Sequence, residues 1–330
     1  MVEYGRKTGE ALKTLKDQDE RLNAQYYDGQ WVFLRIAEYT GEKQPWTKYA
    51  NEAAATYERH MQENDARVMG YRKFPHGLYA AWKLHGDEKA REQLLRMREN
   101  SVFSDPTLDK AKKWYQQRYS REVAYSLQTE VLAARAGAGD AQRTKHFADM
   151  ALRHIKAWTE GDYVSGDKTQ RFCKPFMAGL TASSLIAYYE HTAELGNPDE
   201  RVPKAIRTLA DWLWAEMWVA DVDGSGYGAF KYIAPPQDGK GGGGPAPDLN
   251  QLIAPMYGWL YQHTGKAKYA KRGDAIFAAG VELAYVGSGK QFNQSYRSSF
   301  DYLMWRAAGN GGSAKNRPTG PTIAWSPAGS

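Results

Sequence analysis

The chain has 330 residues, of which 42% are hydrophobic and 25% charged, a composition that is ordinary for a globular protein. Its formal net charge of +6 at pH 7 favours an anionic partner, although no block of consecutive basic residues marks a nucleic-acid tail. The single Cys173 excludes an intramolecular disulfide and a cysteine-based zinc site, and no apolar run is long enough to span a bilayer.

In chain order, the sequence opens with a stretch that reads as one amphipathic helix over residues 6–24. Five helical pairs follow, each with a tight glycine-containing turn: "YTGE", "LHGD", "GAGD", "LGNPD" and "HTGK". A pitch of about 45 to 50 residues suits two helices and their loops. The first helices of the pairs, and a last unpaired helix over 295–307, are predicted to begin near Trp31, His76, Arg121, Lys174, Asp248 and Tyr296.

The two helices of each pair differ in character. First helices such as "MAGLTASSLIAYY" carry small and aromatic residues on several faces, which is typical of a buried, closely packed helix. Second helices such as "KYAKRGDAIFAAGVE" have one apolar stripe and one charged face, so we expect an outer layer around an inner one. Pairing the leading helix with the trailing one gives twelve helices in six hairpins, an all-α (α/α)6 ring. An open helical solenoid has similar repeat lengths and remains the alternative.

This rhythm of aromatic inner helices and charged outer helices over residues 6–307 resembles the six-hairpin α/α-toroid enzymes, a group of polysaccharide lyases and glycoside hydrolases. The sequence does not indicate one family among them. We expect a single catalytic domain over 1–309, followed by a linker-like tail over 310–330. Residues 221–247 form a Gly- and Pro-rich insertion, for which a functional lid and a disordered loop are the alternatives, with a short strand or hairpin expected at "YGAFKYI".

Parallel inner helices would bring their N-terminal ends to one rim, and those ends are rich in cations, amides and phenols. Helix N-termini add positive potential and free N–H groups, so this rim is predicted to attract an anionic chain. The candidate substrate-binding residues are Trp31, Arg72, Lys73, Arg118, Tyr119, Lys174, Asn250, Asn293 and Arg297, with Trp114 and Arg171 at the same level.

Cleavage of a uronate polymer by a lyase requires three groups. A cation or amide must stabilise the uronate carboxylate, a base must take the C5 proton, and an acid must protonate the leaving glycosidic oxygen. In lyases with related toroids, the base and acid are typically His or Tyr, and the resemblance therefore points to those residue types here. The candidates are His76 as base, Tyr125 or Tyr296 as acid or as combined base and acid, and Arg121 with the neighbouring cations at the carboxylate. The sequence predicts a polysaccharide lyase acting by β-elimination.

A glycoside hydrolase acting on an acidic saccharide is the alternative, and it requires two carboxyl groups flanking the bond. Asp28, Glu122, Asp248 and Asp301 are available at the predicted rim, with Asp28 and Asp248 the preferred pair. A non-catalytic helical-repeat binding module is a further alternative.

An anionic polysaccharide is the expected partner, and neither a membrane nor a nucleic acid is favoured. No cofactor or metal is expected, although a structural calcium ion stays open. We expect a secreted or periplasmic protein if a signal peptide precedes this sequence, with a cytoplasmic one as the alternative.

Overall fold

The computed structural model describes residues 1–107, 113, 115–161, 172–234 and 243–310. This part of the chain is mostly helical, which confirms the all-α prediction. One set of helices comprises α3 (Gly29–Thr40), α5 (Pro75–His85), α7 (Ser120–Arg135), α9 (Pro175–Glu194), α11 (Ala254–Thr264), α13 (Gly289–Tyr296) and α14 (Ser299–Asn310). The others are α1 (Val2–Thr14), α2 (Gln18–Ala24), α4 (Trp46–Glu63), α6 (Glu88–Asn100), α8 (Ala141–Glu160), α10 (Arg201–Met217) and α12 (Ala267–Glu282).

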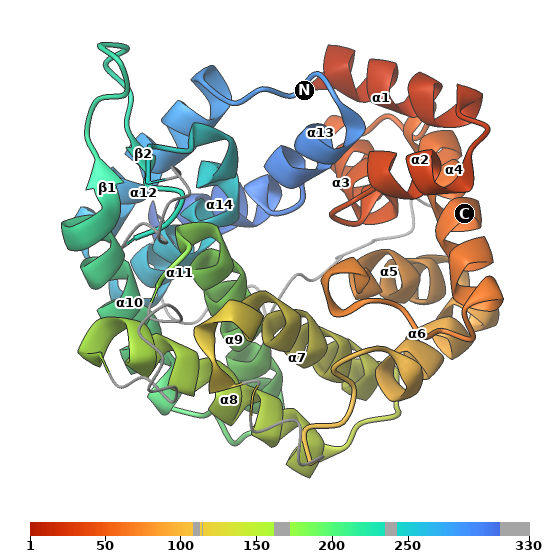
Figure 1. The fold of residues 1–330 in the computed structure, drawn as a ribbon, viewed down its shortest axis with the longest axis horizontal. Helices are drawn as coiled ribbons and strands as arrows, with labels where there is room; N and C mark the ends of the chain where they lie inside the picture. The colour runs from red at the N-terminus through yellow and green to blue at the C-terminus, as the bar shows by residue number, and fades with distance from the viewer. Residues whose placement is uncertain (108–112, 114, 162–171, 235–242, 311–330) are drawn as a thin grey trace.

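The helices of the first set contact one another in a circuit. The order is α3, α5, α7, α9, α11 and α14, and α13 packs against both α14 and α3. The helices α4, α6, α8, α10 and α12 each pack on the preceding inner helix, and Figure 1 shows them around the periphery of the view. A six-hairpin toroid requires these neighbour relations, and the toroid assignment itself stays a prediction.

The glycines in the five predicted turns adopt the left-handed conformation that ends a helix. Their φ angles lie between 66° and 83° at Gly41, Gly86, Gly137, Gly196 and Gly265. An L-residue with a side chain is disfavoured in this region, so glycine at these positions directs the chain from an inner helix into the next outer one. The turn chemistry read from the sequence therefore places the hairpins correctly.

Both terminal helices are interrupted, contrary to prediction. The leading stretch is divided into α1 and α2, because Leu15 is extended and Asp17 starts a new helix by accepting a hydrogen bond from the Glu20 N–H. The trailing stretch begins earlier than predicted, with α13, and continues after a two-residue break as α14. The fifth inner helix starts with a 3-10 turn, η5 (Pro247–Leu252), before α11.

The predicted insertion supplies the second strand of a short hairpin, whose first strand lies just before it. Strand β1 (Trp218–Val219) pairs antiparallel with β2 (Ala229–Phe230). Asn250, predicted to bind substrate, is instead fully buried beneath it: the side-chain amide donates to Gly228 O and Ile276 O at 3.1 and 3.3 Å, and Oδ1 accepts from Phe230 N. Asn250 therefore anchors the hairpin to the start of the fifth inner helix. Residues 235–242 of the insertion, and the tail beyond Asn310, lie outside the described residues.

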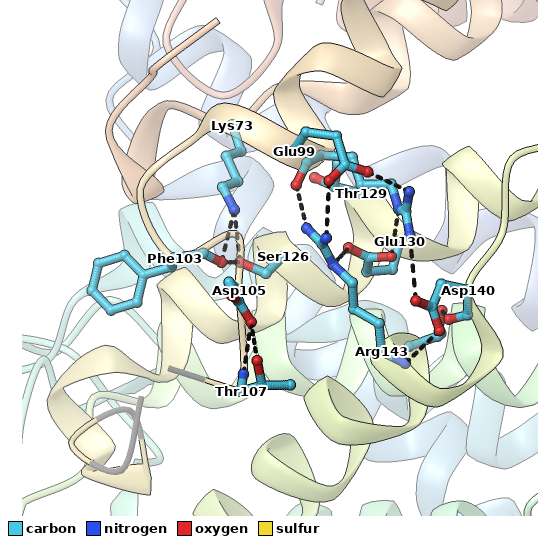
Figure 2. Close-up of polar contacts among 12 residues, drawn as sticks. Lys73, Glu99, Phe103, Asp105, Thr107, Ser126, Thr129, Glu130, Asp140 and Arg143 are labelled. Carbon is cyan, nitrogen blue, oxygen red and sulfur yellow. Dashed lines mark hydrogen bonds and ion pairs between the residues drawn. The ribbon is translucent and has the colours of Figure 1, made fainter. Parts of the chain in front are cut away.

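Lys73, also predicted to bind substrate, is a buried residue. Its side chain extends from the segment after the 3-10 turn η1 (Gly70–Arg72) into the protein, where Nζ donates to Ser126 Oγ at 2.8 Å and to Phe103 O at 3.2 Å (Figure 2). Burial lowers the pKa of Lys73 to about 7, against the opposing effect of the Glu130 carboxylate. Glu130 is itself held by Arg98 and Arg143 at 2.8 and 2.7 Å.

We expect Lys73→Met to change the pH dependence of stability. The unfolded chain binds a proton at Lys73 up to about pH 10.4, whereas the folded chain loses it near pH 7. The free energy of unfolding of the parent protein should therefore rise between pH 7 and 10, by about 2 to 4 kcal/mol from this group. Lys73→Met should lack that rise, and its stability relative to the parent should be greatest at pH 7. Urea unfolding measured across this pH range tests the prediction. Lys204→Met, on the exposed face of α10, is the control. If the free energy of unfolding changes with pH equally in the parent and in Lys73→Met, the prediction is contradicted.

Candidate functional site

One recess at the predicted rim has a volume of about 670 Å³ and is hereafter called the basin. It is formed by segments that lie far apart in the sequence: the end of α2 and the residues after it, η1, the first turn of α7 and the start of α13. Its lining residues are Asn23, Ala24, Tyr26, Tyr71, Arg72, Arg121, Ser288, Gly289, Lys290 and Gln291. Each of these segments lies at or just before the N-terminal end of an inner helix, as predicted for the rim.

Three cations in the basin lie against two tyrosine rings. The guanidinium groups of Arg72 and Arg121 are 6.0 and 5.4 Å from the centre of the Tyr71 ring, and Lys290 Nζ is 5.3 Å from the centre of the Tyr26 ring. The two rings are stacked at 6.4 Å. Cation–π contact holds the long side chains in place while leaving N–H groups to bind a ligand.

Two helices point uncapped N-termini at the basin. Neither α7 nor α13 has a side chain that accepts a hydrogen bond from its first turn. Free backbone N–H groups and the helix dipole therefore add positive potential beside Arg121 and Lys290. Glu122 offsets part of it, since Oε1 accepts from Arg121 Nη2 at 2.7 Å. The basin remains cationic overall, because the lining residues themselves include three cations and no carboxylate.

Asp28, two residues after Tyr26 of the basin, joins the starts of two inner helices. This residue has a left-handed backbone and is only 3% exposed. Oδ2 accepts hydrogen bonds from the backbone N–H groups of His76 and Gly77 at 3.0 and 3.1 Å, and Oδ1 accepts from Trp31 N at 3.3 Å. A Cβ at Gly77 would lie 2.6 Å from Asp28 Oδ1, so this approach requires glycine. One carboxylate thus holds the first turns of α3 and α5 together.

A second recess, hereafter the internal cavity, has a volume of about 60 Å³. It is surrounded by five inner helices, and Arg297 and Ser298 in the break before α14 also line it. Its walls are formed by Trp31, His76, Gln128, Leu180, Ser183, Ile186, Ala187, Glu190, Arg297, Ser298, Asp301 and Trp305. Tyr125, which is fully buried, lies near both recesses: it raises the pKa of Tyr26 in the basin, and the Arg297 guanidinium is 4.8 Å from its ring centre.

Burial shifts the protonation of the acid and base groups around the internal cavity. It raises the pKa of Glu190 to about 8, with a further contribution from the Asp301 charge and an opposing one from Arg135. Burial also raises the pKa of Asp301, which Arg35 and Arg297 oppose, and Arg35 Nη2 lies 3.5 Å from Asp301 Oδ1. Burial and the neighbouring arginines lower the pKa of His76, so its imidazole is neutral at pH 7.

The structure therefore divides the predicted rim between two recesses. Arg72 and Arg121 line the basin, whereas Trp31, His76, Arg297 and Asp301 line the internal cavity. His76, predicted to share one site with Arg72 and Arg121, lines a different recess from them: its ring lies 5.6 Å from the Trp31 ring, and its backbone N–H donates to Asp28. Tyr125 and Glu122 are buried.

The remaining predicted residues lie outside both recesses. Tyr119 packs on Phe103 at 5.2 Å, with Arg118 stacked on its ring, and Lys174 contacts Phe172 and Tyr232. Asn293 is buried and donates to Ala24 O, Tyr296 packs on Phe292, and Asp248 accepts from Tyr285 N at 2.6 Å. Each has a structural partner that accounts for its position. Trp114 and Arg171 lie outside the described residues.

Sequence reasoning missed Tyr26, Tyr71 and Lys290 in the basin, and Glu190 in the internal cavity. Tyr26 and Tyr71 each precede an inner helix by a few residues, next to the candidates Asp28 and Arg72, so proximity to a helix start was a usable signal. Lys290 was missed because α13 begins before the predicted start of the last helix. Glu190 lies in the last turns of α9, far from the end that the sequence singled out.

Comparison with protein-family models, with curated proteins and with solved structures finds no match to this chain. Within the described ranges, no three His, Cys, Asp or Glu side chains gather in a way that could hold a metal ion. Among the described helices, none is both long enough and apolar enough to cross a bilayer. Functional inference therefore depends on the geometry of the two recesses.

We expect Asp28→Ala to destabilise the protein by about 2 to 4 kcal/mol, because three buried N–H groups at the start of α3 and α5 lose their acceptor. Part of that cost is backbone strain, since Asp28 has a φ of 69°. Asp223→Ala controls for the strain, because Asp223 is exposed and has a φ of 53°. Thermal and urea unfolding of both variants test this expectation; losses of similar size would contradict the helix-joining role of Asp28.

Proposed function

We propose that the protein is a polysaccharide lyase that cleaves an anionic, uronate-containing polysaccharide by β-elimination in the basin. The observation that supports this most is the convergence of Arg72, Arg121 and Lys290 on two stacked tyrosine rings from four separate segments of the chain. Guanidinium and ammonium groups bind carboxylates strongly, and aromatic rings at the edge of a recess suit sugar rings.

In this proposal, the cations neutralise the uronate carboxylate as charge develops on it. Tyr71, whose ring lies against the Arg72 and Arg121 guanidinium groups, is the proposed base that takes the C5 proton. The C–H electron pair forms the C4=C5 double bond, and the bond between C4 and the glycosidic oxygen breaks. Tyr26 donates a proton to the leaving oxygen; burial raises its pKa, so its hydroxyl is protonated at neutral pH.

The hydrolase alternative has less support, because its preferred carboxylates have structural partners. Asp28 accepts three backbone hydrogen bonds, Asp248 caps the Tyr285 N–H, and Glu122 is buried with Arg121. Neither the basin nor any one recess contains two of the four predicted carboxylates. A pair flanking one glycosidic bond is thus not formed by these residues.

The reaction class is tested by incubating the full chain with alginate, glucuronan, pectate and glycosaminoglycans. We expect ultraviolet absorbance to rise with at least one of them, because β-elimination creates an unsaturated, conjugated uronate. Reducing ends should appear in step with the absorbance. Reducing ends without absorbance would indicate a hydrolase, and binding without either signal would indicate a binding module; each result contradicts the proposal.

The roles within the basin are separable by kinetics. Tyr71→Phe should lower kcat by roughly a hundredfold or more with little change in KM, because a proton-transfer group contributes on that scale. Arg72→Gln and Lys290→Gln should each weaken the interaction with the polymer by about 1 kcal/mol, and hence raise KM roughly fivefold.

Tyr232→Phe is the matched control for Tyr71→Phe, since Tyr232 also contacts a cation, Lys174, but lies outside the basin. We expect it to retain the parent kcat and KM. Unchanged turnover in Tyr71→Phe would remove Tyr71 from the reaction, and equal losses in both variants would indicate a general effect of removing a hydroxyl.

A further inference from the structure

Arg297 is a buried cation without a carboxylate at ion-pair distance in the part of the chain that the structure describes. The residue is only 4% exposed. One guanidinium nitrogen, Nη2, donates to Gln128 Oε1 at 2.9 Å, whereas Nη1 has no hydrogen-bond partner among the described groups. Desolvating a charge costs several kcal/mol unless an opposite charge offsets it. An anion that binds beside Arg297 would supply this compensation.

The internal cavity next to Arg297 has room for such an anion. Its volume of about 60 Å³ corresponds to roughly four to six water molecules. Trp31 and Trp305 contribute aromatic walls, and Ser183 and Ser298 contribute hydroxyl groups. The space is too small for a polymer and suits a short organic molecule with a few hydroxyl groups.

The other ionisable groups near the internal cavity compensate the charge of Arg297 only from a distance: it acts on the buried carboxylates of Asp28 and Asp301, but no described carboxylate lies within ion-pair distance of it. Asp301 is paired with Arg35 at 3.5 Å. Glu190 is largely protonated at pH 7, because burial raises its pKa to about 8. His76 is neutral, because burial lowers its pKa. A protonated carboxyl, two hydroxyls and a guanidinium are all hydrogen-bond donors, and together they match the oxygens of a carboxylate.

We infer that the internal cavity is a binding site for a small hydroxy acid of about the size of glycerate, with the carboxylate against Arg297 and the carbon chain between Trp31 and Trp305. This site is separate from the basin and does not depend on the lyase proposal. The apolar walls favour an organic anion over inorganic phosphate, and Arg297 Nη1, which has no hydrogen-bond partner among the described groups, favours a monoanion over a neutral polyol.

The test is isothermal titration calorimetry of the full chain with D-glycerate, glycerol and inorganic phosphate as probes. We expect D-glycerate to bind, with glycerol and phosphate at least tenfold weaker. Arg297→Gln should weaken D-glycerate binding by at least tenfold, and Arg297→Lys, which keeps the charge, should weaken it less. Arg72→Gln, which changes only the basin, should alter D-glycerate affinity by less than twofold.

Unfolding without ligand gives a second, independent readout. Arg297→Gln should be at least as stable as the parent protein, because it removes a buried charge that has no carboxylate at ion-pair distance among the described residues. A marked loss of stability would show that the contacts with Gln128 and Tyr125 make Arg297 structural, and would overturn the inference. Equal binding of glycerol and D-glycerate, tighter binding of phosphate, loss of binding in Arg72→Gln, or no binding of any probe (water only in the cavity) would overturn it as well.

Discussion

The hydrogen bonds that the Asp28 carboxylate accepts from two helix starts fix the arrangement on which both recesses depend. This carboxylate holds α3 and α5 at the same level through Trp31, His76 and Gly77. Residues just before it and before α5, such as Tyr26 and Tyr71, belong to the basin, whereas residues just after the helix starts, such as Trp31 and His76, belong to the internal cavity. A shift of one helix along the other would disrupt both recesses at once.

The two recesses present different electrostatic environments. The basin is open and cationic, with Arg72, Arg121 and Lys290 supported by tyrosine rings and by uncapped helix N-termini. The internal cavity is small and desolvated, so burial rather than local charge determines the protonation of Glu190 and His76. An extended polyanion fits the first environment, and a compact monoanion fits the second. The same inner helices give rise to both environments: residues at or before their N-terminal ends line the basin, and residues along their lengths line the internal cavity.

Helical periodicity and turn glycines were sufficient to predict the hairpins, because Gly41, Gly86 and Gly265 end helices by a local mechanism. The breaks at Leu15 and before Ser299 were not predicted, since tertiary packing decides whether a long amphipathic stretch bends. Arg72 and Arg121, both predicted at the rim from the sequence, line the basin together.

The sequence alone could not assign side chains to separate recesses, because neighbouring positions at a helix start point in different directions. Lys73 shows this most clearly: it neighbours Arg72, yet its chain turns inward to Ser126.

The most direct test of the central claim is the crystal structure of Tyr71→Phe with a polyuronate oligosaccharide that the parent protein cleaves. The account predicts that the sugar lies in the basin, with uronate carboxylates against Arg72, Arg121 or Lys290 and the C5 atom of one residue facing the position of the Tyr71 hydroxyl. An oligosaccharide bound anywhere else on the protein, with the basin free, would contradict the account.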